Sequence, residues 1–116
     1  MATFYKNAKV DLTSTDITTL YTAPSATTGD PTTAIFRSIL VADDSGSTST
    51  ITLTLTDSSS NVFVIYNVKA TAANGTVELL TQPLVVEESE ILKVTAGNAN
   101  RLHVVASYVE VTRYWQ

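Results

Sequence analysis

The most regular alternation of hydrophobic and polar residues lies in the middle of the chain, within residues 49–69. Its first half places three aliphatic residues on one side of an extended backbone and threonines on the other: Ile51, Leu53 and Leu55 against Thr50, Thr52, Thr54 and Thr56. A period of two predicts a strand with one buried and one solvated face. The polar run 57–61 is typical of a turn, and the β-branched and aromatic residues of 62–67 predict a returning strand. We therefore predict a β-hairpin.

Shorter segments of the same character lie on both sides of this hairpin, separated by polar turns. They predict strands at residues 3–10, 18–22, 34–43, 76–80, 84–86, 91–95 and 101–113. Lys6 and Lys9 place the first of these at a sheet edge, because charged side chains discourage pairing with another chain. The segment 34–43 is largely apolar on both sides, which predicts a central strand covered on both faces or one whose outer face contacts another subunit.

Two further features concern the later segments: the turns that connect them and the regularity of the last strand. Asn74-Gly75 is the strongest short hairpin signal in the chain, since both residues tolerate positive φ, and residues 97–100 are interpreted as a second hairpin turn. In the last segment, the adjacent Val104 and Val105 interrupt the alternation and predict a bulge or burial on both faces.

About seven or eight short strands with regularly spaced turns are typical of an all-β sandwich or barrel. No window shows apolar residues at helical spacing with capping signals, so no helix is predicted. With 116 residues and no internal repeat, the chain is predicted to be one domain. We predict a single antiparallel β-sandwich over residues 1–116, jelly-roll or immunoglobulin-like, with a short aromatic tail at 114–116.

Composition narrows the classes of partner and chemistry. The net charge of −4 and seven dispersed basic residues argue against nucleic-acid binding. The chain has no cysteine, so disulfides and thiolate chemistry are excluded. No apolar run is long enough to span a bilayer, and the first residues lack the pattern of a signal peptide. We expect a soluble protein made in a cytoplasm, with no membrane partner.

The sequence offers no convincing catalytic, cofactor or metal site. Its single histidine, His103, lies within a predicted strand with no serine on a sharp turn nearby, and we interpret it as a sheet-face residue. The acidic clusters at 43–46 and 57–61 lack the spacing of a dedicated calcium loop and are interpreted as turns. The glutamates at 87–90 are interpreted as a solvated turn. We predict no enzymatic activity and no cofactor.

Nearly the whole chain, residues 5–113, resembles a group of small structural proteins of tailed phages, common among cyanophages. The matching motifs are LYTAPS (20–25), AIFRSILV (34–41), TLTLTD (52–57), LL (79–80), PLVV (83–86), ILKVTA (91–96) and VVASYVE (104–110). The resemblance implies a β-sandwich carried on the virion, with no catalytic residues. Proteins of this group serve as head decoration, or cement, proteins or as tail, collar and fibre-associated modules. Of these we expect a decoration protein that stabilises the head by binding between capsid subunits.

Two alternatives stay open beside the decoration protein. One is a tail, neck, baseplate or fibre-associated protein, and the other is a carbohydrate-binding module for host adhesion. The tyrosines are too scattered in the sequence to indicate a sugar site. Expected partners are the major capsid protein or other virion proteins, together with further copies of the chain in a homo-oligomer such as a trimer.

The last three residues, Tyr114, Trp115 and Gln116, are the candidate protein–protein contact. They follow a long apolar strand with no turn residue between, and they include the only tryptophan. Tyrosine and tryptophan are enriched at the energetic centres of interfaces. Packing within the same domain and docking on a neighbouring subunit are equally compatible with this pattern.

We predict that deleting residues 114–116 leaves the domain folded but weakens its attachment to the particle or to its own copies. Thermal melting of the truncated chain measures the first effect, and its retention on purified virions or its elution as an oligomer measures the second. A large loss of melting temperature with unchanged attachment would mean that the tail packs into its own core.

Overall fold

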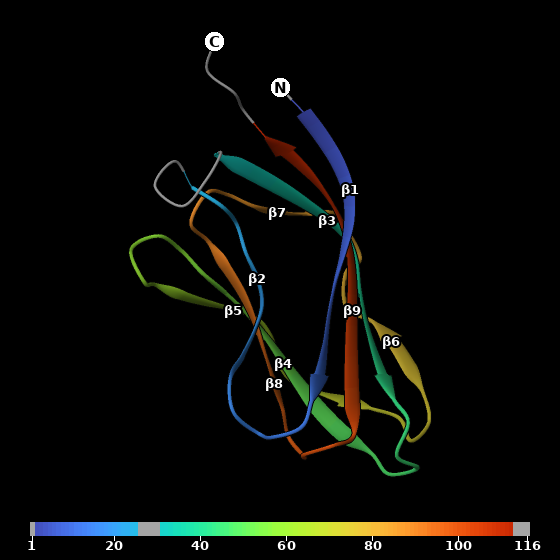
Figure 1. The fold of residues 1–116 in the computed structure, drawn as a ribbon. Coiled ribbons are helices and arrows are strands. Elements are labelled where there is room, and N and C mark those ends of the chain that lie inside the picture. Colours follow the sequence, from blue (N-terminus) through green and yellow to red (C-terminus); the bar gives the residue numbers. More distant parts are fainter. Residues whose placement is uncertain (1, 26–30, 113–116) are drawn as a thin grey trace.

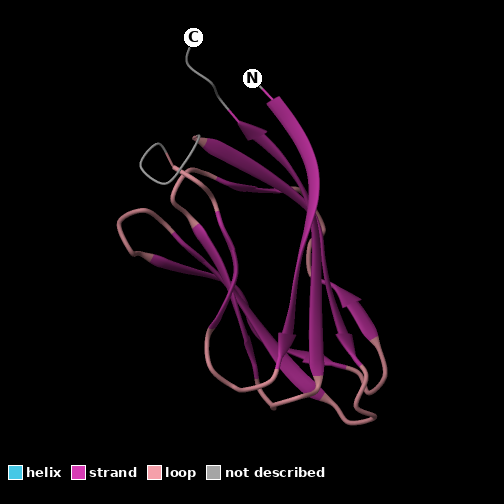
Figure 2. Ribbon diagram, viewed as in Figure 1, coloured by secondary structure: helices cyan, strands magenta, loops and turns pink. Residues whose placement is uncertain are grey.

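The computed structural model describes residues 2–25 and 31–112, which form nine strands in two antiparallel sheets (Figures 1 and 2). The strands are β1 (Ala2–Leu12), β2 (Thr18–Thr22), β3 (Thr32–Asp43), β4 (Ser49–Thr56), β5 (Val62–Thr71), β6 (Thr76–Glu78), β7 (Leu84–Val86), β8 (Ile91–Ala96) and β9 (Leu102–Thr112). None of the described residues forms a helix that could cross a membrane. The predicted all-β sandwich is confirmed.

The strand order is that of a jelly roll. The five-stranded sheet runs β1-β9-β3 and ends with β6 and β7, which both pair with β3; the four-stranded sheet runs β2-β8-β4-β5. Because β6 lies beside residues 40–42 of β3 and β7 beside residues 34–36, the two short strands together occupy one edge position. Counted as one interrupted strand, they complete the eight strands and paired Greek keys of a jelly roll. The described residues thus form nine strands, one for each segment expected individually, whereas the total was predicted as about seven or eight.

Two of the predicted hairpins are wrong. Asn74 has a φ of 54° and the Gly75 N–H donates to the Ala72 carbonyl at 3.0 Å, so a tight turn does form there. However, this turn links β5 to β6, which belong to opposite sheets, and residues 97–100 likewise link β8 to β9 across the sandwich. Turn chemistry fixes a local reversal, whereas the burial of the flanking strands decides which sheet each one joins.

The core lies between the inner faces of the two sheets, and β9 contributes to it with unbroken alternation. Its inward side chains are buried from Leu102 to Thr112, and its outward ones, including Val105, are exposed or half-buried. The predicted irregularity at Val104-Val105 is therefore wrong. It lies instead in β3, where the register against β9 shifts between Phe36 and Ser38. The bulge adds Arg37 and moves the inward positions of β3 from Ala34 and Phe36 to Ile39 and Val41.

The central hairpin, β4 with β5, forms as predicted. Ile51 and Leu53 are fully buried, and Leu55 is partly buried where the hairpin leaves the body of the sandwich. The threonines between them are half-buried on the other face, and the Thr52 hydroxyl accepts a hydrogen bond of 3.1 Å from the Val68 N–H. The inward positions deduced from the alternation are confirmed for Ile51 and Leu53, whereas Thr56, expected on the solvated face, is buried.

We predict that Leu53→Ala lowers the free energy of unfolding by about 2–5 kcal/mol, the usual cost of truncating a buried leucine. Thr52→Ala removes one hydrogen bond at a half-buried position and is expected to cost about 0.5–1.5 kcal/mol. Denaturant unfolding of the two variants checks this ranking. An equal or larger effect of Thr52→Ala would contradict the assignment of Leu53 to the central core.

Candidate functional site

An apolar row crosses the outer face of the five-stranded sheet. Tyr5 of β1 lies opposite Val109 of β9, Val109 lies opposite Ile35 of β3, and Ile35 lies opposite Val85 of β7. We call these four residues the outer apolar row. Tyr5 is 84% exposed and Val85 49%, whereas Val109 and Ile35 are half-buried between them. Four strands thus present one continuous apolar strip to solvent.

The same face carries a second apolar pair further along the strands. Val105 of β9 lies opposite Leu40 of β3, and the two side chains are 41% and 40% exposed. Ser107 and Ser38, which face each other, and the exposed bulge residue Arg37 separate this pair from the outer apolar row on these two strands. An exposed apolar surface that extends over neighbouring strands marks an interaction site more often than isolated exposed residues do.

A hollow of about 340 Å³ adjoins the outer apolar row at its β1 end. It is lined by Tyr5, Lys6, Asn7, Arg37, Ser107, Tyr108 and Val109. Arg37 reaches this surface because it is the extra residue of the β3 bulge, and bulges commonly redirect a side chain in this way. An exposed aromatic ring beside guanidinium, amide and hydroxyl groups can stack on a ligand and hydrogen-bond to it.

A buried polar network ties the two sheets together beneath this face. The Tyr21 hydroxyl of β2 donates to Glu110 Oε2 of β9 at 2.5 Å, and Lys6 Nζ lies 2.8 Å from Glu110 Oε1. Glu110 is only 5% exposed, whereas the Lys6 side chain is half exposed. Burial, together with the hydrogen bond and charge of Glu110, raises the pKa of the Tyr21 hydroxyl far above its usual range.

Three aromatic rings pack around this network. Phe36 and Tyr108 stack with their centroids 4.6 Å apart, and the Tyr21 ring lies 5.2 Å from Phe36 and 4.8 Å from Tyr108. The fold thus gathers aromatic residues that are scattered in the sequence, but it does so in the core. Of the tyrosines in the described residues, Tyr5 is the one on the open outer surface.

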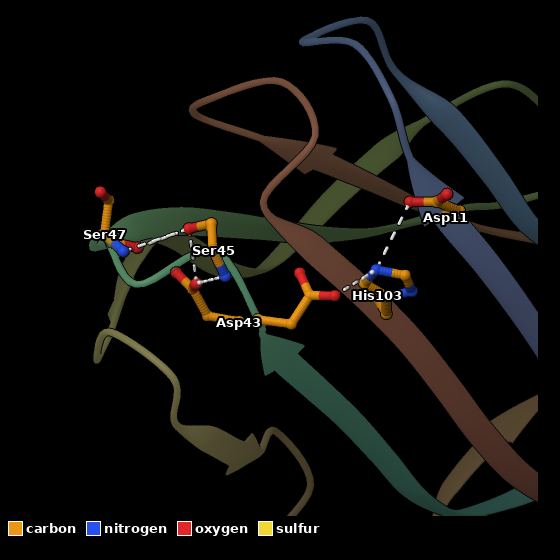
Figure 3. Close-up of polar contacts among 6 residues, drawn as sticks. Asp11, Asp43, Ser45, Ser47 and His103 are labelled. Atoms are coloured by element: carbon orange, nitrogen blue, oxygen red, sulfur yellow. Dashed lines mark hydrogen bonds and ion pairs between the residues drawn. The ribbon is translucent and has the colours of Figure 1, made fainter.

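His103 lies on the outer face of β9, the sheet-face position expected from the sequence (Figure 3). Its Nε2 lies 3.2 Å from Asp44 Oδ2 and 3.8 Å from Asp11 Oδ1. No carboxylate neighbour of this histidine could be predicted from the sequence, because Asp11 becomes its neighbour only through the pairing of β1 with β9. Among the described residues, no group of histidine and acidic side chains is arranged to hold a metal ion.

The two acidic clusters form turns, as interpreted. Asp43 Oδ1 accepts hydrogen bonds from the Ser45 N–H at 3.0 Å and the Ser45 hydroxyl at 2.8 Å (Figure 3). Asp57 Oδ1 accepts from the backbone N–H groups of Ser59 and Asn61, each at 2.9 Å. Hydrogen bonds from the backbone lower the pKa of both carboxyl groups. The candidate contact residues Tyr114, Trp115 and Gln116 lie outside the described residues, so their role stays a prediction.

No protein-family model and no curated protein matches the chain. Among solved structures, it is similar to a chain of "Structure of infectious bursal disease virus Gx strain", with a TM-score of 0.41 and 12% sequence identity. The match covers 97% of this chain but only 29% of that one. The assignment of the fold rests on the strand order described above and not on this likeness.

We predict that Tyr21→Phe lowers the free energy of unfolding by about 1.5–3 kcal/mol, the usual contribution of a hydrogen bond to a charged group. Tyr108→Phe is the matched control, because Tyr108 belongs to the same aromatic cluster and its hydroxyl forms no hydrogen bond with any described residue. Its effect is expected to stay within about 0.5 kcal/mol. Equal effects of the two variants in denaturant unfolding would contradict the proposed link between Tyr21 and Glu110.

Proposed function

We propose that this chain is a non-enzymatic structural protein of a virus particle and, more specifically, a head decoration protein of a tailed phage. The resemblance of residues 5–113 to small virion proteins supports the first part. The observation that carries the adhesive role is the outer apolar row, an exposed apolar strip on a rigid sheet. The proposed partner is the major capsid protein or another protein of the virion.

Adhesion through such a surface needs no moving part and no chemical step. The strip lies on paired strands whose backbones are fixed by the ladder, so little conformational entropy is lost when a flat partner covers it. Many copies bound to one lattice hold each other at high effective concentration, so a modest contact per copy suffices for stable attachment.

A tail, neck, baseplate or fibre position would use the same surface on a different partner. Copy number separates the two locations, because a decoration protein covers the many repeats of a capsid lattice whereas a tail component is present in few copies. Gel densitometry of purified particles measures this ratio. A few copies per particle would overturn the head assignment and leave the virion assignment standing.

Carbohydrate binding is the second candidate function, and the hollow beside Tyr5 favours it. Tyr5 offers a ring face, and Asn7 and Arg37 offer hydrogen-bond donors on the same surface. Aromatic stacking combined with a few polar groups is a common way to orient a small ligand. Binding on a glycan array that is lost in Tyr5→Ala would support a host-adhesion role, and an empty array would exclude it for the glycans displayed.

For the primary proposal, we predict that Val85→Glu weakens retention on purified particles about tenfold or more, a factor equivalent to about 1.4 kcal/mol. A charge at the β7 end of the apolar strip must be desolvated when the partner covers it. Thr19→Glu is the control, because it introduces the same charge at an exposed position of the other sheet. Both variants are expected to melt like the unaltered protein, and equal retention of the two would overturn the outer apolar row as the contact.

A further inference from the structure

The strands at the sheet edges differ in how well they are protected against pairing with another chain. β1 carries Lys6 and Lys9, and β2, β6 and β7 are only five, three and three residues long. Charged side chains and short length are the usual means of preventing edge-to-edge association. β5 has ten residues and no charge before Lys69.

The first part of β5 is regular and apolar. Val62, Phe63 and Val64 pair in order with Thr56, Leu55 and Thr54 of β4, and the register shifts come only beyond Val64. These three consecutive residues are 60%, 55% and 56% exposed. Because successive side chains of a strand point to opposite faces, β5 is uncovered on both faces here as well as along its edge. In Figure 1 this part of the hairpin projects from the side of the sandwich away from β1.

The first three residues of this edge, Val62, Phe63 and Val64, are palindromic about Phe63. In an antiparallel pair of two identical strands with Phe63 at the centre, Val62 lies opposite the second copy's Val64, and the two Phe63 side chains face each other. Each of these three positions then places an apolar residue opposite an apolar residue, and such cross-strand pairs stabilise a sheet. The same strand serves both sides, as a two-fold interface requires.

The charge distribution also favours a second copy of the chain as the partner that pairs with the β5 edge. The chain has a net charge of −4, so most surfaces of two copies repel each other. Residues 58–68 contain no charged side chain, so two β5 edges can approach without opposing like charges.

We propose that β5 pairs antiparallel with β5 of a second copy, centred on Phe63, and joins two four-stranded sheets into one continuous eight-stranded sheet. The inference is independent of the proposed virion function, since it concerns the isolated protein in solution. On a particle, it would link neighbouring copies in pairs.

Single-cysteine variants test the register, since the chain has no cysteine of its own and each variant carries one thiol. Phe63→Cys is expected to form a disulfide-linked dimer under mild oxidation, because the two Phe63 positions face each other. Asn67→Cys is the matched control at an exposed position of the same strand. In this register the two Asn67 positions lie roughly 25 Å apart, far beyond the Cα separation of about 7 Å or less that a disulfide spans.

Sedimentation of the unaltered and charged variants tests the interface itself. The unaltered protein is expected to dimerise, Phe63→Lys to be monomeric with an unchanged melting temperature, and Val85→Lys on the outer apolar row to dimerise normally. Val64→Lys repeats the test should Phe63→Lys fail to fold. The proposal would be overturned if the unaltered protein stayed monomeric at every concentration, or if Val85→Lys dissociated the dimer and Phe63→Lys did not. It would also be overturned if Asn67→Cys formed the disulfide-linked dimer and Phe63→Cys did not.

Discussion

The structure depends on the packing of two inner sheet faces against each other, and β9 is central to it. β9 pairs with β1 on one side and β3 on the other along nearly its whole length, while its inward side chains from Leu102 to Tyr108 are buried. Among the described strands, only β4–β5 and β6–β7 follow each other within one sheet. Neither sheet can therefore be completed by local turns, and long-range pairing governs folding.

A buried carboxyl group at one end of this interface makes the packing specific. Glu110 lies among aromatic rings, where an unpaired charge would be costly. The Tyr21 hydroxyl and the Lys6 ammonium occupy its two oxygens, so strands of both sheets converge on one residue. Lys6 is half exposed and its attraction is screened by salt, so the hydrogen bond from Tyr21 contributes more to holding the sheets together.

The sequence predicted what is local and missed what is not. The β2 and β7 bounds and the inward positions Ile51 and Leu53 of β4 followed from alternation and from proline and polar turns, which act over a few residues. The two register shifts between β4 and β5 were not predicted. The bulge at Arg37 could not be predicted from the sequence. Residues 34–43 are apolar on both sides, so their pattern is compatible with an alternation that continues or one that shifts by a residue. The partners of His103 and Glu110 could not be deduced, since β1 and β2 reach them only through the order of strands in the sheets. The outer apolar row could not be predicted for the same reason, because its four residues come from four strands whose order in the sheet must be known first.

The outer apolar row and the β5 edge lie on different sheets, and this separation bears on assembly. The row faces away from the four-stranded sheet, and β5 is the free edge of that second sheet. A partner lying flat on the row therefore leaves β5 accessible, and pairing at β5 leaves the row accessible. Apolar side chains left in water on two surfaces add nothing to the stability of the folded chain. Under the two proposals, both sites can be occupied at once, so one contact would hold a scaffold while the other would link the copies bound to it.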